Sequence, residues 1–264
     1  MTKKIAAFLA TLITGLALPA QTAPPIPSPA ETTPAVWVLT SSVVSQYMFR
    51  GTRLGGPAFQ PSLEYDAGSL GLGIFVNAPI KDKVSGQSDP EVDYYGFYAV
   101  AVAKNLSVVP GITCYTMPRA KKNNGFYPAT FEPNIALTYS LGQLSITPKF
   151  YYDLILKGPT AELTAAAAIP LKNLGTELDF TVSTGTFIYK NYVAESTPHT
   201  KNWGDYYLVG VSLPYQVGKN SKLSISCTYT KGLNNYLKQG TDGKTRNSAA
   251  LGRGVISLNY IVSF

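Results

Sequence analysis

Residues 252–264 end the chain with the sequence GRGVISLNYIVSF, in which large apolar residues alternate with small or polar ones up to the last position. The residues that share the apolar parity are Ile256, Leu258, Tyr260, Val262 and Phe264. Because successive side chains of a β-strand point to opposite faces, this pattern predicts a strand with one apolar face. A soluble domain usually leaves its last residues polar and frayed, so an apolar final strand indicates apolar surroundings.

The same alternation recurs along most of the chain from Trp37 onward, with Ser, Thr, Gly, Asn, Gln or charged residues between the apolar positions. Helical spacing fits these segments poorly. The predicted strands are residues 36–50, 58–67, 69–78, 91–102, 106–116, 129–140, 143–154, 161–170, 176–189, 204–216, 221–231 and 252–264. Each is near the 9–11 residues that a tilted strand needs to cross a bilayer.

The connections between these strands alternate in length. The short ones are residues 67–69, 103–105, 141–142, 171–175 and 217–220, and the longest ones are residues 79–90, 117–128, 190–203 and 232–251. Short turns opposite longer loops are typical of single-chain outer-membrane barrels, and no edge strand can stay unpaired in hydrocarbon. We therefore predict an all-β fold, a closed antiparallel transmembrane β-barrel of about 12 strands with both ends periplasmic.

The first residues predict export. Lys3 and Lys4 precede an apolar run at 5–18, and Ala20 offers a small-residue cleavage site. The run is too short to span a bilayer. We interpret residues 1–20 as a cleaved signal peptide, residues 21–35, with five prolines, as a Pro-rich periplasmic lead-in, and residues 36–264 as the barrel. The predicted location is the bacterial outer membrane.

Composition and charge agree with one exported barrel domain. The chain is 45% hydrophobic and contains 18 Tyr and 11 Phe. Without Lys3 and Lys4, 20 basic residues stand against 15 acidic ones, a formal balance of +5. The basic residues are scattered and form no long run, so we expect no nucleic-acid partner.

Some residues fit the predicted strands poorly. Six prolines fall inside predicted strands: Pro61, Pro110, Pro133, Pro148, Pro170 and Pro214. Proline lacks the ladder donor, so we expect Pro133 and Pro148 to need bulges or a place at the membrane rim. Residues 160–168 contain five alanines and have helical propensity, but the even strand count and the loop pattern favour a strand there.

If the apolar positions face lipid, the alternate positions face the lumen. The pore-lining candidates are Arg50, Glu64, Asp66, Asp93, Glu132, Lys149, Asp153, Glu162, Asp179, Lys222 and Arg253. Both signs of charge occur, as in water-filled pores. The alternative is that these side chains pair across strands and plug a narrow barrel.

The predicted external loops carry most of the excess positive charge, with Arg119, Lys121 and Lys122 as candidates for an extracellular basic mouth. Such a mouth could draw in small anions by electrostatic steering. It could equally balance the phosphates of neighbouring lipopolysaccharide.

Cysteine and histidine usage indicates no catalytic or metal centre. Cys114 and Cys227 fall on the fifth and eleventh predicted strands, on opposite walls of a twelve-strand ring, so both thiols should be free. His199 is the only histidine and lies in a predicted loop without a nucleophile held beside it. We therefore expect no metal, no cofactor and no enzymatic activity.

Three short segments carry a family resemblance: residues 45–51 (SQYMFRG), residues 57–66, and the strand at 91–96 (EVDYYG). They resemble the TorF-type porin family of bacterial outer-membrane proteins. The resemblance covers residues 36–115. The last strand, with Tyr260 and the terminal Phe264, is similar to the barrel-insertion signal of bacterial outer-membrane proteins, which implies the barrel-assembly machinery as a partner. The resemblance implies a barrel and a pore and supplies no catalytic residues.

The expected function is passive passage of small hydrophilic solutes, with outer-membrane lipids and lipopolysaccharide as surroundings. One alternative is a non-conducting structural or surface-binding barrel. A second is an outer-membrane lipid hydrolase or protease, which also uses barrels of 10–12 strands. The sequence indicates neither the solute nor the oligomeric state.

If the basic mouth steers anions, replacing Arg119, Lys121 and Lys122 with Gln should lower anion preference in dilute salt. At 1 M salt the change should be small, because the Debye length falls from about 10 Å at 0.1 M to about 3 Å. Replacing Asp93 and Glu132 should instead alter selectivity from inside the lumen, with weaker screening. Reversal potentials across planar bilayers measure both effects, and a loop effect that persists in strong salt would contradict the steering argument.

Overall fold

The structure, a computed structural model, describes residues 35–82, 90–120, 128–188, 203–234 and 252–264. The predicted signal peptide and all but the last residue of the predicted lead-in lie outside these ranges. The described chain is almost entirely β-structure, with one short 3₁₀ turn, η2 (Lys172–Leu174). No helix in the described ranges is long and apolar enough to cross a membrane.

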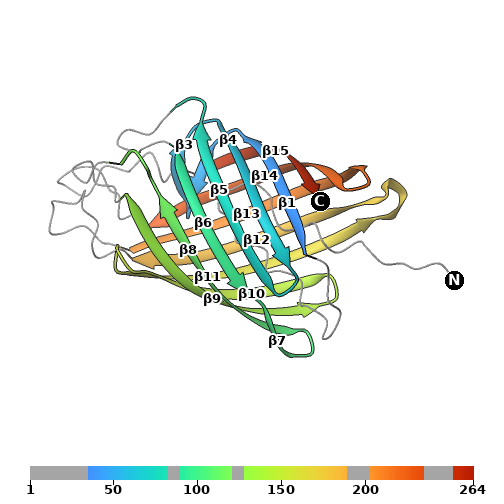
Figure 1. The fold of residues 1–264 in the computed structure, drawn as a ribbon, viewed down its shortest axis with the longest axis horizontal. Coiled ribbons are helices and arrows are strands. Elements are labelled where there is room, and N and C mark those ends of the chain that lie inside the picture. Colours follow the sequence, from blue (N-terminus) through green and yellow to red (C-terminus); the bar gives the residue numbers. More distant parts are fainter. Residues whose placement is uncertain (1–34, 83–89, 121–127, 189–202, 235–251) are drawn as a thin grey trace.

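Twelve antiparallel wall strands form a closed barrel (Figure 1). Their bounds are β1 (Val36–Val44), β4 (Ala58–Ala67), β5 (Leu70–Pro79), β6 (Glu91–Tyr98) continued by β7 (Val100–Ala103), β8 (Leu106–Thr116), β9 (Ala129–Leu141), β10 (Leu144–Asp153), β11 (Gly158–Leu171), β12 (Thr176–Ile188), β13 (Trp203–Gly218), β14 (Ser221–Asn234) and β15 (Arg253–Ser263). β6 and β7 are parts of one wall strand, since both pair with β8. The predicted fold class and strand number are confirmed.

The barrel closes where its first and last strands meet. β1 pairs with β15 from Val38↔Ser263 to Val44↔Ser257. Two further hydrogen bonds extend this seam: Trp37 N donates to Phe264 O and Phe264 N donates to Trp37 O, each at 2.9 Å. The start of β1 and the end of β15 therefore lie together at the end of the barrel that carries the short turns (Figure 1).

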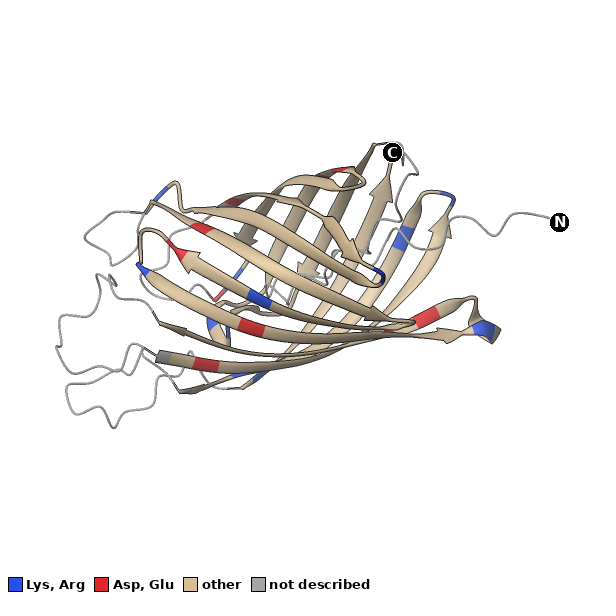
Figure 2. Cartoon of the chain, turned by 90° about the horizontal axis from the view of Figure 1, so that it is seen from below, with Lys and Arg blue, Asp and Glu red and all other residues tan. Residues whose placement is uncertain are grey.

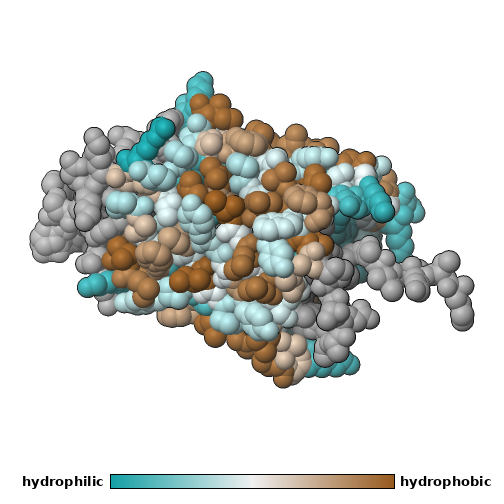
Figure 3. All heavy atoms as spheres, viewed as in Figure 1, coloured by the Kyte–Doolittle hydropathy of each residue, from teal (hydrophilic) through white to brown (hydrophobic). Residues whose placement is uncertain are grey.

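The alternation of the sequence becomes two faces of the wall. On β15, Ile256 is 63% exposed on the outer face, whereas Asn259, which has the opposite parity, is fully buried on the inner face. Trp37, Leu72, Ile135 and many other large apolar side chains are likewise exposed on the outer surface. Figure 3 shows hydrophobic side chains spread over the visible face of the wall, with the most hydrophilic ones toward its ends. An apolar outer band of this kind is a property of membrane barrels.

The predicted first strand, residues 36–50, is wrong in its second half. The wall strand ends at Val44, and residues 45–57 fold inward around a hairpin of β2 (Tyr47–Phe49) and β3 (Thr52–Gly55). Tyr47 shares the parity of the outward Trp37 and Val43, which predicts an outer position, yet it is fully buried. The alternation misleads here because a hairpin inside a barrel is also built from strands of period two.

Pro133 and Pro148 each interrupt the pairing of their strand with one neighbouring strand, and neither introduces a bulge. Pro148 keeps its register with Leu163 on β11, and only the pairing toward β9 is interrupted. Pro133 pairs in register with Ile112. Of the two alternatives expected for Pro133 and Pro148, a bulge or a place at the membrane rim, the bulge is absent, because the intact ladder on one side holds the register when a donor is missing on the other. Residues 160–168 lie within β11, which confirms the strand.

Cys114 on β8 and Cys227 on β14 are free, as expected from their places on opposite walls. Titration of denatured, unreduced protein with a thiol reagent should therefore detect two reactive groups per chain. A disulfide needs Cα atoms within about 7 Å, so a titration that detects none would contradict this strand order.

A candidate channel interior

The β2–β3 hairpin turns on two residues with left-handed backbone. Arg50 has φ 45° and Gly51 has φ 74°, which is the signature of a type I′ turn. Glycine adopts this conformation freely, whereas a residue with a Cβ loses roughly 1–2 kcal/mol. Gly51 is also required by space: a Cβ there would lie 2.6 Å from the backbone N of Gly232 on β14. The tip of the hairpin thus rests against the barrel wall.

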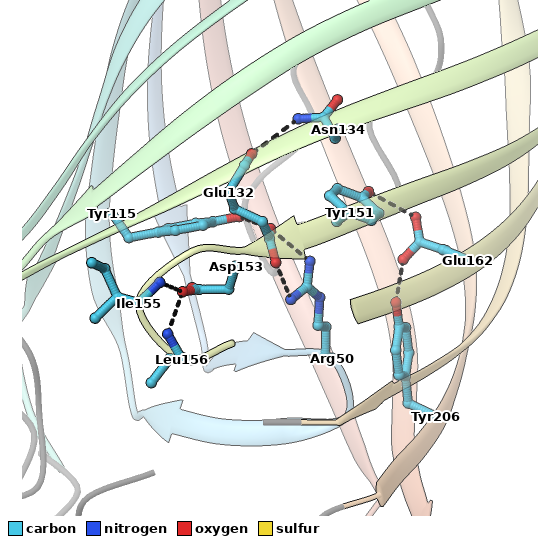
Figure 4. Close-up of polar contacts among 10 residues, drawn as sticks. All are labelled: Arg50, Tyr115, Glu132, Asn134, Tyr151, Asp153, Ile155, Leu156, Glu162 and Tyr206. Carbon is cyan, nitrogen blue, oxygen red and sulfur yellow. Dashed lines mark hydrogen bonds and ion pairs between the residues drawn. The ribbon is translucent and has the colours of Figure 1, made fainter. Parts of the chain in front are cut away.

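Arg50 extends from this tip to the far side of the barrel (Figure 4). Its two terminal nitrogens each lie 2.8 Å from an oxygen of Glu132 on β9, a bidentate ion pair that is almost fully buried. The guanidinium also stacks on two rings, 4.7 Å from the centroid of Phe49 and 4.9 Å from that of Tyr151. Planar stacking combined with a bidentate pair is available to Arg and not to Lys.

Tyrosines and a second glutamate continue the network along the wall. The Tyr115 hydroxyl donates to Glu132 at 3.0 Å. Glu162 on β11 accepts from Tyr151 at 3.3 Å and from Tyr206 at 2.5 Å. Lys149 stands directly opposite Glu162 in register, and its Nζ lies 4.7 Å from the Tyr151 ring centroid. The network therefore joins β8, β9, β10, β11 and β13 to the hairpin (Figure 4).

Two tyrosines reach a glutamate across a glycine on the strand between them. Tyr206 on β13 crosses Gly185 on β12 to Glu162 on β11. Tyr95 on β6 crosses Gly73 on β5 to Glu64 on β4, with a bond of 2.8 Å. A Cβ at Gly73 would lie 2.2 Å from the Tyr95 ring, and one at Gly185 would lie 2.5 Å from the Tyr206 ring. These glycines therefore let the rings lie flat on the inner wall.

A row of polar side chains crosses the inner wall from β14 to β6. Its members, which we call the polar row, are Ser224, Asn259, Ser42, Gln60, Asn77 and Glu91. They occupy one register position on six neighbouring strands, and Gln60 donates to Asn77 at 2.9 Å. Tyr47 of the hairpin donates to Glu91 at 2.8 Å. The hairpin therefore contacts this side of the interior as well as β9.

By burial and strand parity, the ten pore-lining candidates on wall strands lie on the inner face, and Arg50 reaches the interior from the hairpin. Figure 2 shows how charged residues are distributed along the strands. Some stabilise local structure. Asp66 accepts from Gly68 N, and Asp153 accepts from Ile155 N and Leu156 N, so both hold turns. Asp179 accepts from Ser212 at 3.2 Å.

The remaining candidates are spread over the interior. Asp93 is 2% exposed and stands between Phe75 and Tyr115 in register. Lys222 and Arg253 are half-buried and stand opposite Gln216 and Thr230 in register.

The candidates omitted Glu91 and Glu177, which share the inner face with Asp93 and Asp179, and carboxylates outnumber cationic groups there with or without them. Sequence reasoning also missed the role of the inward tyrosines. Their signal was the paired tyrosines 94–95, 151–152 and 206–207, because adjacent strand residues must point to opposite faces. Tyr95, Tyr151 and Tyr206 point inward, while Tyr94 and Tyr152 are exposed outside.

Arg119 of the predicted basic mouth is exposed in the turn that follows β8, whereas Lys121, Lys122 and His199 lie outside the described residues. Among the residues that are described, no three His, Cys, Asp or Glu side chains are grouped so that they could hold a metal ion.

The fold is that of bacterial outer-membrane barrels. The KdgM porin is similar to this chain, with a TM-score of 0.50, 13% identity, and coverage of 86% of this chain and 99% of that chain. The NanC porin is similar with a TM-score of 0.50, 12% identity, and coverage of 86% and 98%. An outer membrane channel from Pseudomonas putida F1 has a TM-score of 0.49, 9% identity, and coverage of 89% and 97%. At these identities the likeness concerns the fold alone.

Residues 29–158 match the model of a family described as a bacterial protein of unknown function, Gcw_chp. This match includes the whole of the segment 36–115 that carries the resemblance noted above, together with the Arg50–Glu132 pair. No curated protein matches the sequence.

The buried pair should behave as a coupled unit. Removing one partner of a buried ion pair costs about 3–5 kcal/mol when the other stays buried, so Glu132→Gln should lower the free energy of unfolding by up to about 3 kcal/mol. The double variant Arg50→Gln/Glu132→Gln should lose less than the sum of the single variants, because it leaves no unpaired charge. Urea unfolding of the vesicle-inserted protein measures this cycle, and strict additivity would show that the pair does not contribute.

Proposed function

We propose that the chain is a narrow, passive channel for small hydrophilic solutes in a bacterial outer membrane. The polar inner face carries this proposal. Side-chain atoms of Thr40, Gln60, Ser62, Asn77, Ser224 and Asn259 are buried among the described residues without a hydrogen-bond partner in the protein. An inner wall built from such polar side chains is the lining of a hydrated lumen rather than of a dry packed core.

The flat tyrosines support the same proposal. With Gly73 and Gly185 beneath them, the rings of Tyr95 and Tyr206 stay on the wall and leave the axis of the barrel to solvent. A barrel selected only for a filled core would place large apolar side chains inward at these positions.

The proposal includes a location and partners, for which the barrel fold and the sequence give the support. Export by the segment 1–20, insertion through the strand that ends with Tyr260 and Phe264, and a basic mouth facing lipopolysaccharide form parts of this proposal, as does the TorF-type porin assignment.

The second candidate is a non-conducting barrel, which the hairpin favours. Tyr47 and Met48 are fully buried inside the wall, and Arg50 with Glu132 occupies the interior at the loop end. The two candidates differ in one measurable property, the passage of ions.

The proposed channel predicts a small, stepwise, salt-dependent conductance when the purified protein is inserted into planar bilayers. Gly73→Ala should lower this conductance, because the new methyl group displaces the Tyr95 ring from the wall into the lumen. The double variant Gly73→Ala/Tyr95→Ala should recover it. Gly254→Ala is the matched control, because a Cβ at Gly254 meets nothing within 4 Å. Folded, inserted protein that never conducts would leave the non-conducting barrel as the better account.

A further inference from the structure

We propose that the β2–β3 hairpin is the constriction that sets the size limit of this channel, and that the Arg50–Glu132 pair holds it across the lumen. This inference rests on the proposed channel function and deepens it, since it names the part of the chain that selects solutes by size.

The contacts of the hairpin show that it crosses the interior. It connects β1 and β4, which are neighbours in the wall, yet its residues contact distant strands. Tyr47 bonds to Glu91 on β6, Arg50 to Glu132 on β9, and Gly51 rests on Gly232 of β14. A surface loop between adjacent strands would have no reason to contact three separated parts of the inner wall.

An apolar patch, a hydrogen bond and an ion pair hold the hairpin at different places. Met48 packs on Val44, Ala58 and Val255, an apolar patch on the strands that flank the hairpin. This patch and the Tyr47 bond fix the hairpin near its own side of the barrel. Arg50 carries it to β9, five strands from β1 around the ring, and Phe49 packs edge-on against Tyr115 of the neighbouring β8. Glu132 is therefore the positioning residue for the crossing.

The backbone at the tip indicates that the crossing depends on this contact. Arg50 adopts φ 45°, a conformation that a non-glycine residue avoids unless surrounding contacts hold it. The ion pair with Glu132 and the stacking on Phe49 and Tyr151 are the contacts that do so. Without Glu132 the charged guanidinium would remain in a buried place, and movement of the tip toward water would relieve both costs.

The polarity of the pair fits a size filter for small solutes. Glu132 accepts from Arg50 and Tyr115 together, so the charges of the pair are matched to each other and to neighbouring donors. A constriction whose charges are paired discriminates mainly by the space it leaves, whereas unpaired charges lining a pore would discriminate by sign.

The test is permeation of uncharged sugars and polyethylene glycols of graded size through proteoliposomes, together with single-channel conductance of the full chain. Glu132→Gln should raise the conductance and shift the size limit upward by roughly 5 Å, about the spacing of one strand. Gly51→Ala should shift it in the same direction without changing any charge, because its Cβ would meet the backbone of β14. The swap Arg50→Glu/Glu132→Arg should restore much of the original limit. Lys104→Gln, in an exposed turn at the opposite end, serves as the charge-removal control.

The outcomes of this test distinguish a failure of the proposed constriction from a failure of the proposed channel. A wild-type protein that conducts, with Glu132→Gln and Gly51→Ala at the same size limit, would overturn the constriction and leave the channel intact. A wild-type protein that is closed while Glu132→Gln conducts would support the hairpin as a barrier and overturn the open channel. If neither wild type nor any correctly folded variant conducts, both proposals fail. Heat-modifiability on gels shows which variants are folded.

Discussion

The pairing of β1 with β15 is the interaction on which the rest of this structure depends. An open sheet would leave the backbone N–H and C=O groups of two edge strands without partners, at several kcal/mol for each group in hydrocarbon. The seam from Val38↔Ser263 to Val44↔Ser257, extended by Trp37 and Phe264, removes both edges. Closure then fixes an inside and an outside, so that every strand residue is assigned to one of them by parity.

The inside is where this chain departs from a plain cylinder of strands. Glycines on β5 and β12 make space for tyrosine rings that lie along the wall and bond to glutamates two strands away. The hairpin after β1 enters the same space and is held by one buried ion pair with stacked aromatic neighbours. The tyrosine rings lie along the wall while the hairpin crosses the interior at the loop end, so a few side chains decide how the interior is filled.

Much of the barrel fold could be predicted from the sequence, because period-two alternation is a local property of the chain. The strand bounds at β4 and β8 agree with the predicted 58–67 and 106–116, and the inward parity of Glu64, Glu132 and Asp179 follows from the same count. The error at 36–50 has a physical origin. Tyr47 and Phe49 continue the alternation of β1, and nothing in the local pattern distinguishes a wall strand from a hairpin strand folded inside.

The sequence by itself therefore determined the fold class, the number of strands, the side of the wall on which each charged strand residue lies, and the separation of Cys114 from Cys227, since all of these depend on alternation and connection length. Only the tertiary structure decided that Arg50 meets Glu132, 82 residues away, that Tyr206 crosses Gly185 to reach Glu162, and that residues 45–57 turn inward. These contacts depend on which strands face one another across the closed ring and on how much space small residues leave there, and neither quantity is encoded in the neighbours of a residue along the chain.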